Sequence, residues 1–240
     1  MRALILAAGR GERMRPLSDA TPKPLLRAGG RSLIEWQLAA LARAGIRDIV
    51  INVAHLGGAL RRVLGNGADH GVRIAYSVEG EHAEDALETR GGIARALPLL
   101  GESPFVVTSG DVMTDFDYAA LRRRAEAIAG GAFDAHFVLV DNPPSHPAGD
   151  MALADGRATR AGAPRLTYGN IGVFAPRLFA AVAATRERLF PWMYDVVDAG
   201  RVSAEHYAGR WFNVGTPAEL AALDDRLNAE RLGHSDPAIR

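Results

Sequence analysis

The chain has 240 residues, of which 28 are basic and 28 acidic, 48% are hydrophobic and none is cysteine. This length and hydrophobic content suit one globular domain with ample core. Balanced charge gives no reason to expect nucleic acid or an anionic membrane as a partner, and the lack of cysteine excludes disulfides and thiolate metal sites.

The N-terminus carries no targeting signal that we recognise. The apolar stretch at residues 4–8 is far too short for a signal-peptide core, and Gly9-Arg10 interrupts it. No apolar run reaches the length needed to cross a membrane. We therefore expect a cytoplasmic protein.

The first predicted element is a short buried strand at residues 3–6, followed by a glycine-rich loop with four cations. Gly9 and Gly11 let the backbone adopt positive φ and approach a ligand closely, so that main-chain N–H groups can point at phosphate oxygens. The cations can add charge-assisted hydrogen bonds. They are Arg10, Arg13, Arg15 and Lys23.

Other glycine-rich nucleotide motifs fit this loop less well. A dinucleotide-binding domain needs a third glycine where this chain has Met14, and the G-x-x-x-x-G-K-[ST] pattern is absent. Pro16, Pro22 and Pro24 prevent a helix from starting directly after the glycines. A dehydrogenase is therefore disfavoured, and the remaining alternative is a plain surface turn with scattered arginines.

Helix and strand patterns then alternate through the first half, which predicts an α/β fold with a mostly parallel sheet flanked by helices. We expect helices at residues 32–43 and 56–64, with a further helix starting at 92–97. We expect strands at residues 48–53, 72–77 and 104–108.

The second half is less regular. We expect strands at 135–140, 165–168, 171–174, 202–207 and 210–214, and helices at 176–185, 191–199 and 217 to about 230. Residues 1–240 are expected to form one domain, with a nucleotide-binding half at about 1–115 and a second half at about 116–240. No hexapeptide repeat is present, so we expect no C-terminal β-helix.

Asp111 is the candidate metal ligand. It follows the strand at residues 104–108, and open α/β sheets bind their ligands just past the carboxyl ends of strands. A triphosphate travels with Mg²⁺, which takes one or two protein oxygens together with phosphates and waters. An aspartate in a tight turn is the alternative for this residue taken alone, and its pairing with the N-terminal loop favours the metal.

At this point the chain resembles the sugar-phosphate nucleotidyltransferases, whose signature G-x-G-x-R-[LM]-x-P-L and later P-K-P-[LM] is matched at Gly9 to Leu17 and at residues 22–25. The resemblance implies a three-layer, mostly parallel but mixed, Rossmann-like sheet. It also implies that Arg13 and Lys23 contact the triphosphate, with Lys23 near the α-phosphate under attack. The nucleotide-binding set expected on this basis is Ala8, Gly9, Gly11, Glu12, Arg13, Lys23, Glu79, Thr89 and Gly91.

The same resemblance supplies a second metal ligand. Family members hold Mg²⁺ with the aspartate after the fourth strand and an acidic or amide residue in a W-x-[DN]-x-G-T-P segment. Residues 211–217 match that segment, with Asn213 in place of the commoner aspartate. An amide carries no charge, so we expect weaker affinity for free metal and more dependence on the nucleotide to bring the metal in.

Within the family, the chain resembles the N-acetylmuramate-1-phosphate uridylyltransferases of cell-wall recycling, through residues 87–92, 96–101, 110–115, 166–173 and 209–217. This implies UTP and a sugar-1-phosphate as substrates. Arg90 departs from the subgroup, which has glycine there; it either adds a phosphate contact or points to solvent. Mannose- or heptose-1-phosphate guanylyltransferases are the nearest alternatives, and a catalytically silent nucleotide-binding regulator is the alternative of another class.

The acceptor sugar is expected to contact the irregular second half. The polar segments at residues 146–150 and 168–170 supply Gly149, Asp150 and Asn170 as candidates. Plain turn chemistry is the alternative for each of them. The oligomeric state cannot be inferred from these patterns.

Overall fold

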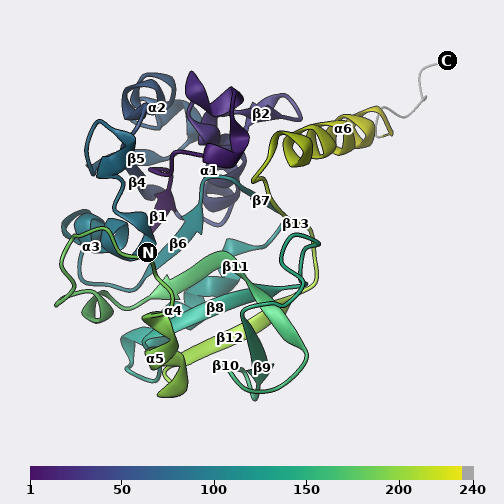
Figure 1. Ribbon diagram of the computed structural model, residues 1–240. Coiled ribbons are helices and arrows are strands. Elements are labelled where there is room, and N and C mark those ends of the chain that lie inside the picture. Colours follow the sequence, from purple (N-terminus) through teal and green to yellow (C-terminus); the bar gives the residue numbers. More distant parts are fainter. Residues whose placement is uncertain (234–240) are drawn as a thin grey trace.

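The computed structural model describes residues 1–233, and its main feature is a nine-stranded mixed sheet with helices on both faces (Figure 1). The apolar runs of the first half form one side of this sheet as parallel neighbours. In spatial order they are β5 (Arg73–Val78), β4 (Asp48–Val53), β1 (Arg2–Leu6) and β6 (Phe105–Ser109).

The other side of the sheet begins with β11 (Arg165–Phe174), which runs antiparallel to both β6 and β8 (Ala135–Val140). Strand β12 (Val202–Tyr207) lies parallel to β8, and the hairpin of β9 (Met151–Ala154) and β10 (Arg157–Thr159) closes the edge. Two short pairs stand apart: β2 (Arg27–Ala28) with β3 (Arg31–Ser32), and β7 (Val112–Thr114) with β13 (Trp211–Asn213). The expected mixed α/β sheet is confirmed.

Side-chain alternation along the strands builds a separate core on each face. Ile5 of β1 packs in the cluster with α1 (Leu33–Arg43), α2 (Gly57–Leu64) and α4 (Leu121–Ala129). Leu4 packs in the cluster with α3 (Glu88–Leu100) and α5 (Met193–Asp198). The last helix, α6 (Pro217–Gly233), extends from the body at the upper right of Figure 1 and buries Leu223 and Leu227 in a third cluster.

Several expected elements differ from the structure. Residues 176–185 form only a 3₁₀ turn (Pro176–Leu178) and not a helix, because a helix there would bury little beyond Phe179 while the alanines stay exposed. Residues 165–168 and 171–174 are one strand, β11, with a register shift between Tyr168 and Gly172. Helix α4 and the hairpins β2–β3 and β9–β10 were not among the expected elements.

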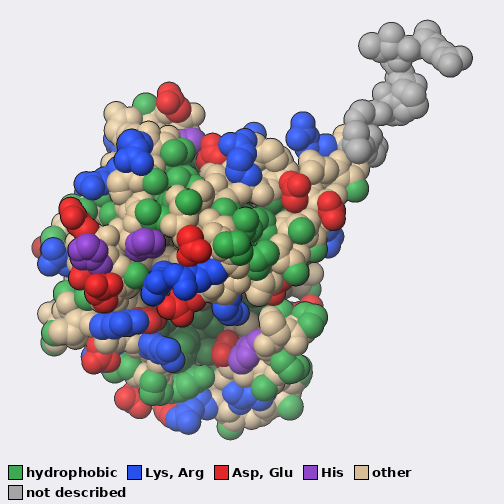
Figure 2. Space-filling view, turned by 45° about the horizontal axis from the view of Figure 1, so that its top comes forward, with side chains coloured by type: hydrophobic (Ala, Val, Ile, Leu, Met, Phe, Trp, Pro, Cys, Tyr) green, Lys and Arg blue, Asp and Glu red, His purple; other side chains and the backbone are tan. Residues whose placement is uncertain are grey.

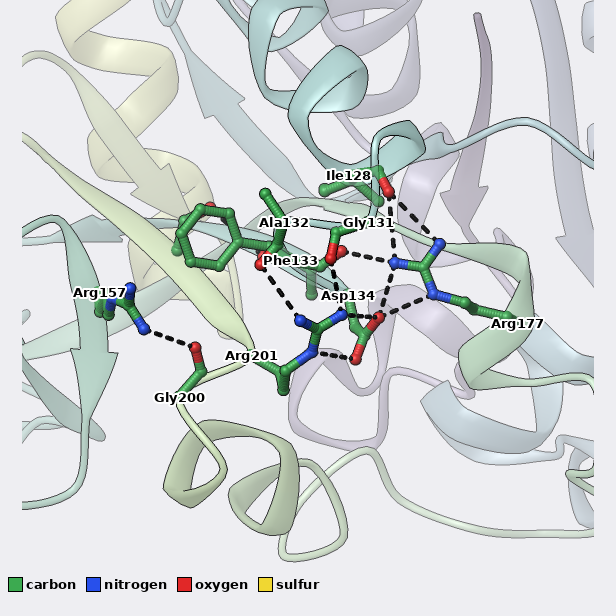
Figure 3. A network of polar contacts seen from close by, with 11 residues as sticks. Ile128, Gly131, Ala132, Phe133, Asp134, Arg157, Arg177, Gly200 and Arg201 are labelled. Carbon is green, nitrogen blue, oxygen red and sulfur yellow. Dashed lines mark hydrogen bonds and ion pairs between the residues drawn. The ribbon is translucent and has the colours of Figure 1, made fainter.

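At the amino ends of β8 and β12, a charged cluster ties the second half together (Figure 3). The Arg201 guanidinium donates to both carboxylate oxygens of Asp134, and Arg177 donates to the same carboxylate at 2.8 Å. Both arginines also donate to carbonyls of the loop at residues 128–133. This cluster lies at the opposite end of the strands from the site described below. Among the described helices, none is long and apolar enough to cross a membrane.

Candidate active site

A cleft of about 820 Å³ opens at the carboxyl ends of the central strands. Leu6 at the end of β1 is in register with Asn52 of β4 on one side and Ser109 of β6 on the other. The Gly110 N–H donates to the Leu6 carbonyl at 2.9 Å. Three strand ends therefore meet at one edge, where parallel sheets bind their ligands.

The glycine-rich loop forms one wall of this cleft. Gly11 adopts φ 66°, the left-handed conformation that favours glycine, and its carbonyl accepts a hydrogen bond from the Ser18 hydroxyl at 2.8 Å. Gly9 has no positive φ, and a Cβ there would meet no protein atom within 4 Å. The loop continues as three short 3₁₀ turns and not as a helix, as its prolines predict.

Lys23 and Asp111 form an ion pair at the base of the cleft. The lysine side chain is only 12% exposed and the aspartate 22%, so each charge depends strongly on the other. Gly110 lets the chain approach closely here, because a Cβ would lie 3.3 Å from the Leu6 carbonyl oxygen and from Pro24. The pair joins the loop after β1 to the end of β6.

The segment at residues 213–215 also lies next to Asp111. Asn213 is in register with Val112, and the Val214 N–H donates to the Asp111 carbonyl at 3.0 Å. Gly215 leaves room for the Arg13 guanidinium, whose carbon would lie 3.3 Å from a Cβ at that position. Three segments far apart in sequence therefore converge on Lys23 and Asp111.

A chain of hydrogen bonds runs across the floor of the cleft through Asn52. The Asn52 side-chain carbonyl accepts from the Ala7 N–H at 2.6 Å, and its amide donates to Glu79 at 2.6 Å. The other Glu79 oxygen accepts from the Leu87 N–H at 2.7 Å. Burial raises the pKa of Glu79, against these hydrogen bonds, which lower it. The chain links the loops after β1 and β5 to the start of α3.

Two arginines that the sequence did not single out complete the lining. Arg186 and Arg188 come from an exposed segment between the 3₁₀ turn at 176–178 and α5. Nothing in their local pattern indicates a site, because they follow a stretch that reads as helix. Asn52 could have been predicted as a site residue, because it is a polar residue at the carboxyl end of a buried strand. Open α/β sheets bind their ligands at that edge.

Most of the nucleotide-binding set lines the cleft. The residues that do so are Ala8, Gly9, Gly11, Glu12, Arg13, Lys23, Glu79 and Thr89, together with Asp111. Gly91 is buried beside the cleft, where its N–H donates to the Glu187 carbonyl at 3.3 Å. Asn213 lies beside the cleft on β13 and is not part of its lining.

None of the three sugar-binding candidates is among the residues that line the cleft. Gly149, at φ 62°, forms a tight turn in which a Cβ would lie 2.8 Å from Asn142. Both Asp150 oxygens are engaged, one by the Tyr168 N–H at 2.8 Å and one by His146 at 3.0 Å. Asp150 lines a second pocket, of about 810 Å³, between the β9–β10 hairpin and α5.

Asn170 is better placed. It has φ 53° at the irregularity of β11, and its neighbour Ile171 is in register with Thr108 of β6. Asn170 therefore lies beside Ser109, which lines the cleft. The Trp211 indole N–H donates to the Gly169 carbonyl at 2.8 Å and holds this irregular turn in place.

Arg90 takes neither of the two expected orientations. It lies in α3 without positive φ, pairs with Glu187 at 3.3 Å and stacks over Trp192 with its guanidinium carbon 4.7 Å from the ring centroid. The positive φ nearby belongs to Glu88, at 59°.

The charge of the residues that line the cleft indicates whether a bound triphosphate would need a metal ion. Among the lining residues, five are basic and five acidic, so a triphosphate needs additional positive charge brought with it. The described residues contain no group of three or more acidic or histidine side chains that could hold a metal by themselves. One carboxylate at Asp111 with the Asn213 amide on the adjacent strand fits Mg²⁺ that arrives with phosphates, because Mg²⁺ keeps few protein ligands.

One face of the molecule carries side chains of both charges. In Figure 2, basic and acidic side chains lie next to one another across the middle of the face, with no broad area of a single sign.

Comparisons with known proteins show the family of the chain. A family model described as "Nucleotidyl transferase" matches residues 2–160. A relative from Neisseria meningitidis serogroup B, N-acetylmuramate alpha-1-phosphate uridylyltransferase, is 45% identical over 92% of this chain and 95% of its own. A relative of the same name from Caulobacter vibrioides is 33% identical over 94% of this chain and 96% of its own.

The fold has solved counterparts. A protein of Bacillus anthracis solved in complex with sucrose, a candidate glucose-1-phosphate thymidylyltransferase, superposes with a TM-score of 0.78. The alignment covers 100% of this chain and 98% of that one at 21% identity. This likeness concerns the fold alone.

Proposed function

The chain belongs to the nucleotidyl transferase family, and we propose that it joins N-acetylmuramate α-1-phosphate to UTP, giving a UDP-sugar and pyrophosphate. The observation that carries the proposal is the Lys23–Asp111 pair, set in a cleft between the glycine-rich loop and residues 186–188. The choice of substrates rests on the relatives that match nearly the whole chain.

In the proposed reaction, an oxygen of the sugar-1-phosphate attacks the α-phosphorus of the triphosphate. The bond from the α-phosphorus to the oxygen that bridges to the β-phosphate breaks, and pyrophosphate leaves with that oxygen. Such a transfer needs positioning and charge stabilisation more than a protein nucleophile. Lys23 stabilises the α-phosphate, and Arg13, against Gly215, binds the β- and γ-phosphates.

Mg²⁺ is the expected cofactor, as is general in this family. Asp111 and Asn213 would hold it, and it would neutralise charge on the phosphate oxygens. In this structure Lys23 forms an ion pair with the Asp111 carboxylate. We therefore infer that Lys23 and the metal would share this carboxylate when substrate binds.

We propose that the acceptor sugar binds between the end of β6 and the irregular part of β11. Asn170 is proposed to contact the sugar, because it lies beside Ser109, which lines the cleft. Gly149 and Asp150 are proposed to act indirectly, since their contacts hold the start of β11. The base is proposed to lie near Glu79 and Thr89.

The experiment is pyrophosphate release with four nucleoside triphosphates against a panel of sugar-1-phosphates, with products identified by mass spectrometry. We expect the highest kcat/KM with UTP and N-acetylmuramate α-1-phosphate. A preference for GTP with mannose- or heptose-1-phosphate would replace this substrate assignment. Triphosphate binding without any pyrophosphate release would indicate a silent regulator and refute the enzymatic proposal.

A further inference from the structure

Arg90 connects the start of α3 to the exposed segment that carries Arg186 and Arg188. Two backbone hydrogen bonds bracket the connection: the Arg90 N–H donates to the Glu187 carbonyl at 2.9 Å, and the Glu187 N–H donates to the Leu87 carbonyl at 3.0 Å. Gly91 permits this close approach, because a Cβ at that position would collide with the Thr185 carbonyl. The segment at residues 185–188 is therefore laid directly on the first turn of the helix.

The Arg90 side chain also contacts this segment. Its guanidinium pairs with the Glu187 carboxylate at 3.3 Å and stacks over Trp192, which packs against the buried Phe179. The side chain is 22% exposed, and its Nε is buried without a hydrogen-bond partner among the described residues. The charge is thus held by Glu187 and the indole face, and it does not reach the cleft.

One further backbone hydrogen bond, from the Gly91 N–H to the Glu187 carbonyl at 3.3 Å, also holds the segment. Residues 183–188 are exposed, and Arg186 pairs with Glu88 at 3.8 Å. An exposed segment with two long cationic side chains would otherwise sample many conformations. Arg186 and Arg188 line the cleft only while the segment stays on α3.

We propose that Arg90 is a positioning residue: it holds residues 185–188 against the start of α3 and so keeps Arg186 and Arg188 on the wall of the cleft. The consequence for substrate binding rests on the proposed function, because it requires phosphate groups in the cleft. The contact itself does not depend on that proposal.

Trypsin provides the test of the contact, since it cleaves after Arg186 and Arg188 when the segment opens. We expect Arg90→Ala to speed cleavage at these two bonds about tenfold, through loss of the stacked and paired guanidinium. Arg157→Ala is the matched control: Arg157 stacks over Phe133 and donates to the Gly200 carbonyl at the far edge of the sheet (Figure 3). It should leave both cleavage rates unchanged.

The second variant, Arg90→Met, keeps an apolar stem over Trp192 and removes the charge, so it serves if Arg90→Ala folds poorly. Cleavage at the wild-type rate in a folded Arg90 variant would overturn the proposal. For the functional part, we expect the KM of at least one substrate to rise about threefold or more, with kcat little changed. Faster cleavage with both KM values unchanged would overturn the link to the cleft.

The two proposals fail in distinguishable ways. Wild-type protein that releases no pyrophosphate with any substrate pair would refute the proposed function, whereas the cleavage rates would still decide whether Arg90 holds the segment.

Discussion

Lys23 and Asp111 carry the most specific chemistry at the scale of single residues. Lys23→Ala and Asp111→Ala should each lower kcat by about 100-fold or more, because charge at the α-phosphate is left uncompensated. Arg15→Ala is the control from the same loop, since Arg15 pairs with Asp19 at 2.8 Å and does not line the cleft. The measurement is steady-state kinetics beside a thermal melt. Near-wild-type turnover in either variant would remove the mechanism.

The second prediction for a single residue concerns Asn213. Asn213→Asp adds a carboxylate on the strand next to Asp111, so the Mg²⁺ concentration for half-maximal rate should fall by about tenfold. Titrating Mg²⁺ at fixed UTP for both proteins measures it. An unchanged metal requirement would show that this side chain does not contribute to the metal site.

The Asp134 cluster makes a prediction at the scale of elements, because it ties the loop before β8 to the start of β12. The Arg201 guanidinium, followed by that of Arg177, lowers the pKa of Asp134. A lowered carboxyl pKa contributes stability that is present above the unfolded-state pKa and lost as pH falls through the folded one. Asp134→Asn should therefore lower the free energy of unfolding at pH 7 by about 2 kcal/mol.

Denaturant unfolding of wild type and Asp134→Asn between pH 7 and pH 3 is the measurement. The difference between the two proteins should shrink as the pH falls, while kcat at pH 7 stays at the wild-type value. A gap independent of pH would mean that the charge of Asp134 is not what stabilises this region.

The elements also show what sequence patterns can and cannot predict. The central strands and α1 were predicted almost to the residue, since burial and helix capping act locally. The β9–β10 hairpin was not predicted, although its turn is the Asp155-Gly156 pair, a sequence typical of tight hairpins. These two residues have φ 48° and 71°. Residues 176–185 read as a helix from their composition, but most of their side chains are exposed and the chain forms only local turns there.

For the molecule as a whole, the convergence of the glycine-rich loop and Asp111 on the cleft could be predicted, and the position of the proposed sugar-binding residues could not. Glycines, cations and Asp111 lie at strand ends, so their meeting follows from a parallel sheet. Gly149, Asp150 and Asn170 depend on how β11 departs from regular pairing, which no local pattern encodes. Arg186 and Arg188 likewise reach the cleft only through long-range contacts with α3.

The central claim is that the nucleotidyl group passes to the sugar phosphate by attack at the α-phosphorus, and label transfer tests it most directly. UTP labelled with ³²P at the α position is incubated with N-acetylmuramate α-1-phosphate and Mg²⁺, in parallel with UTP labelled at the γ position. We predict that the α label appears in the UDP-sugar and the γ label in pyrophosphate, and that Lys23→Ala slows the appearance of both by about 100-fold or more. An α label found in free UMP or left in UTP under these conditions would contradict the account.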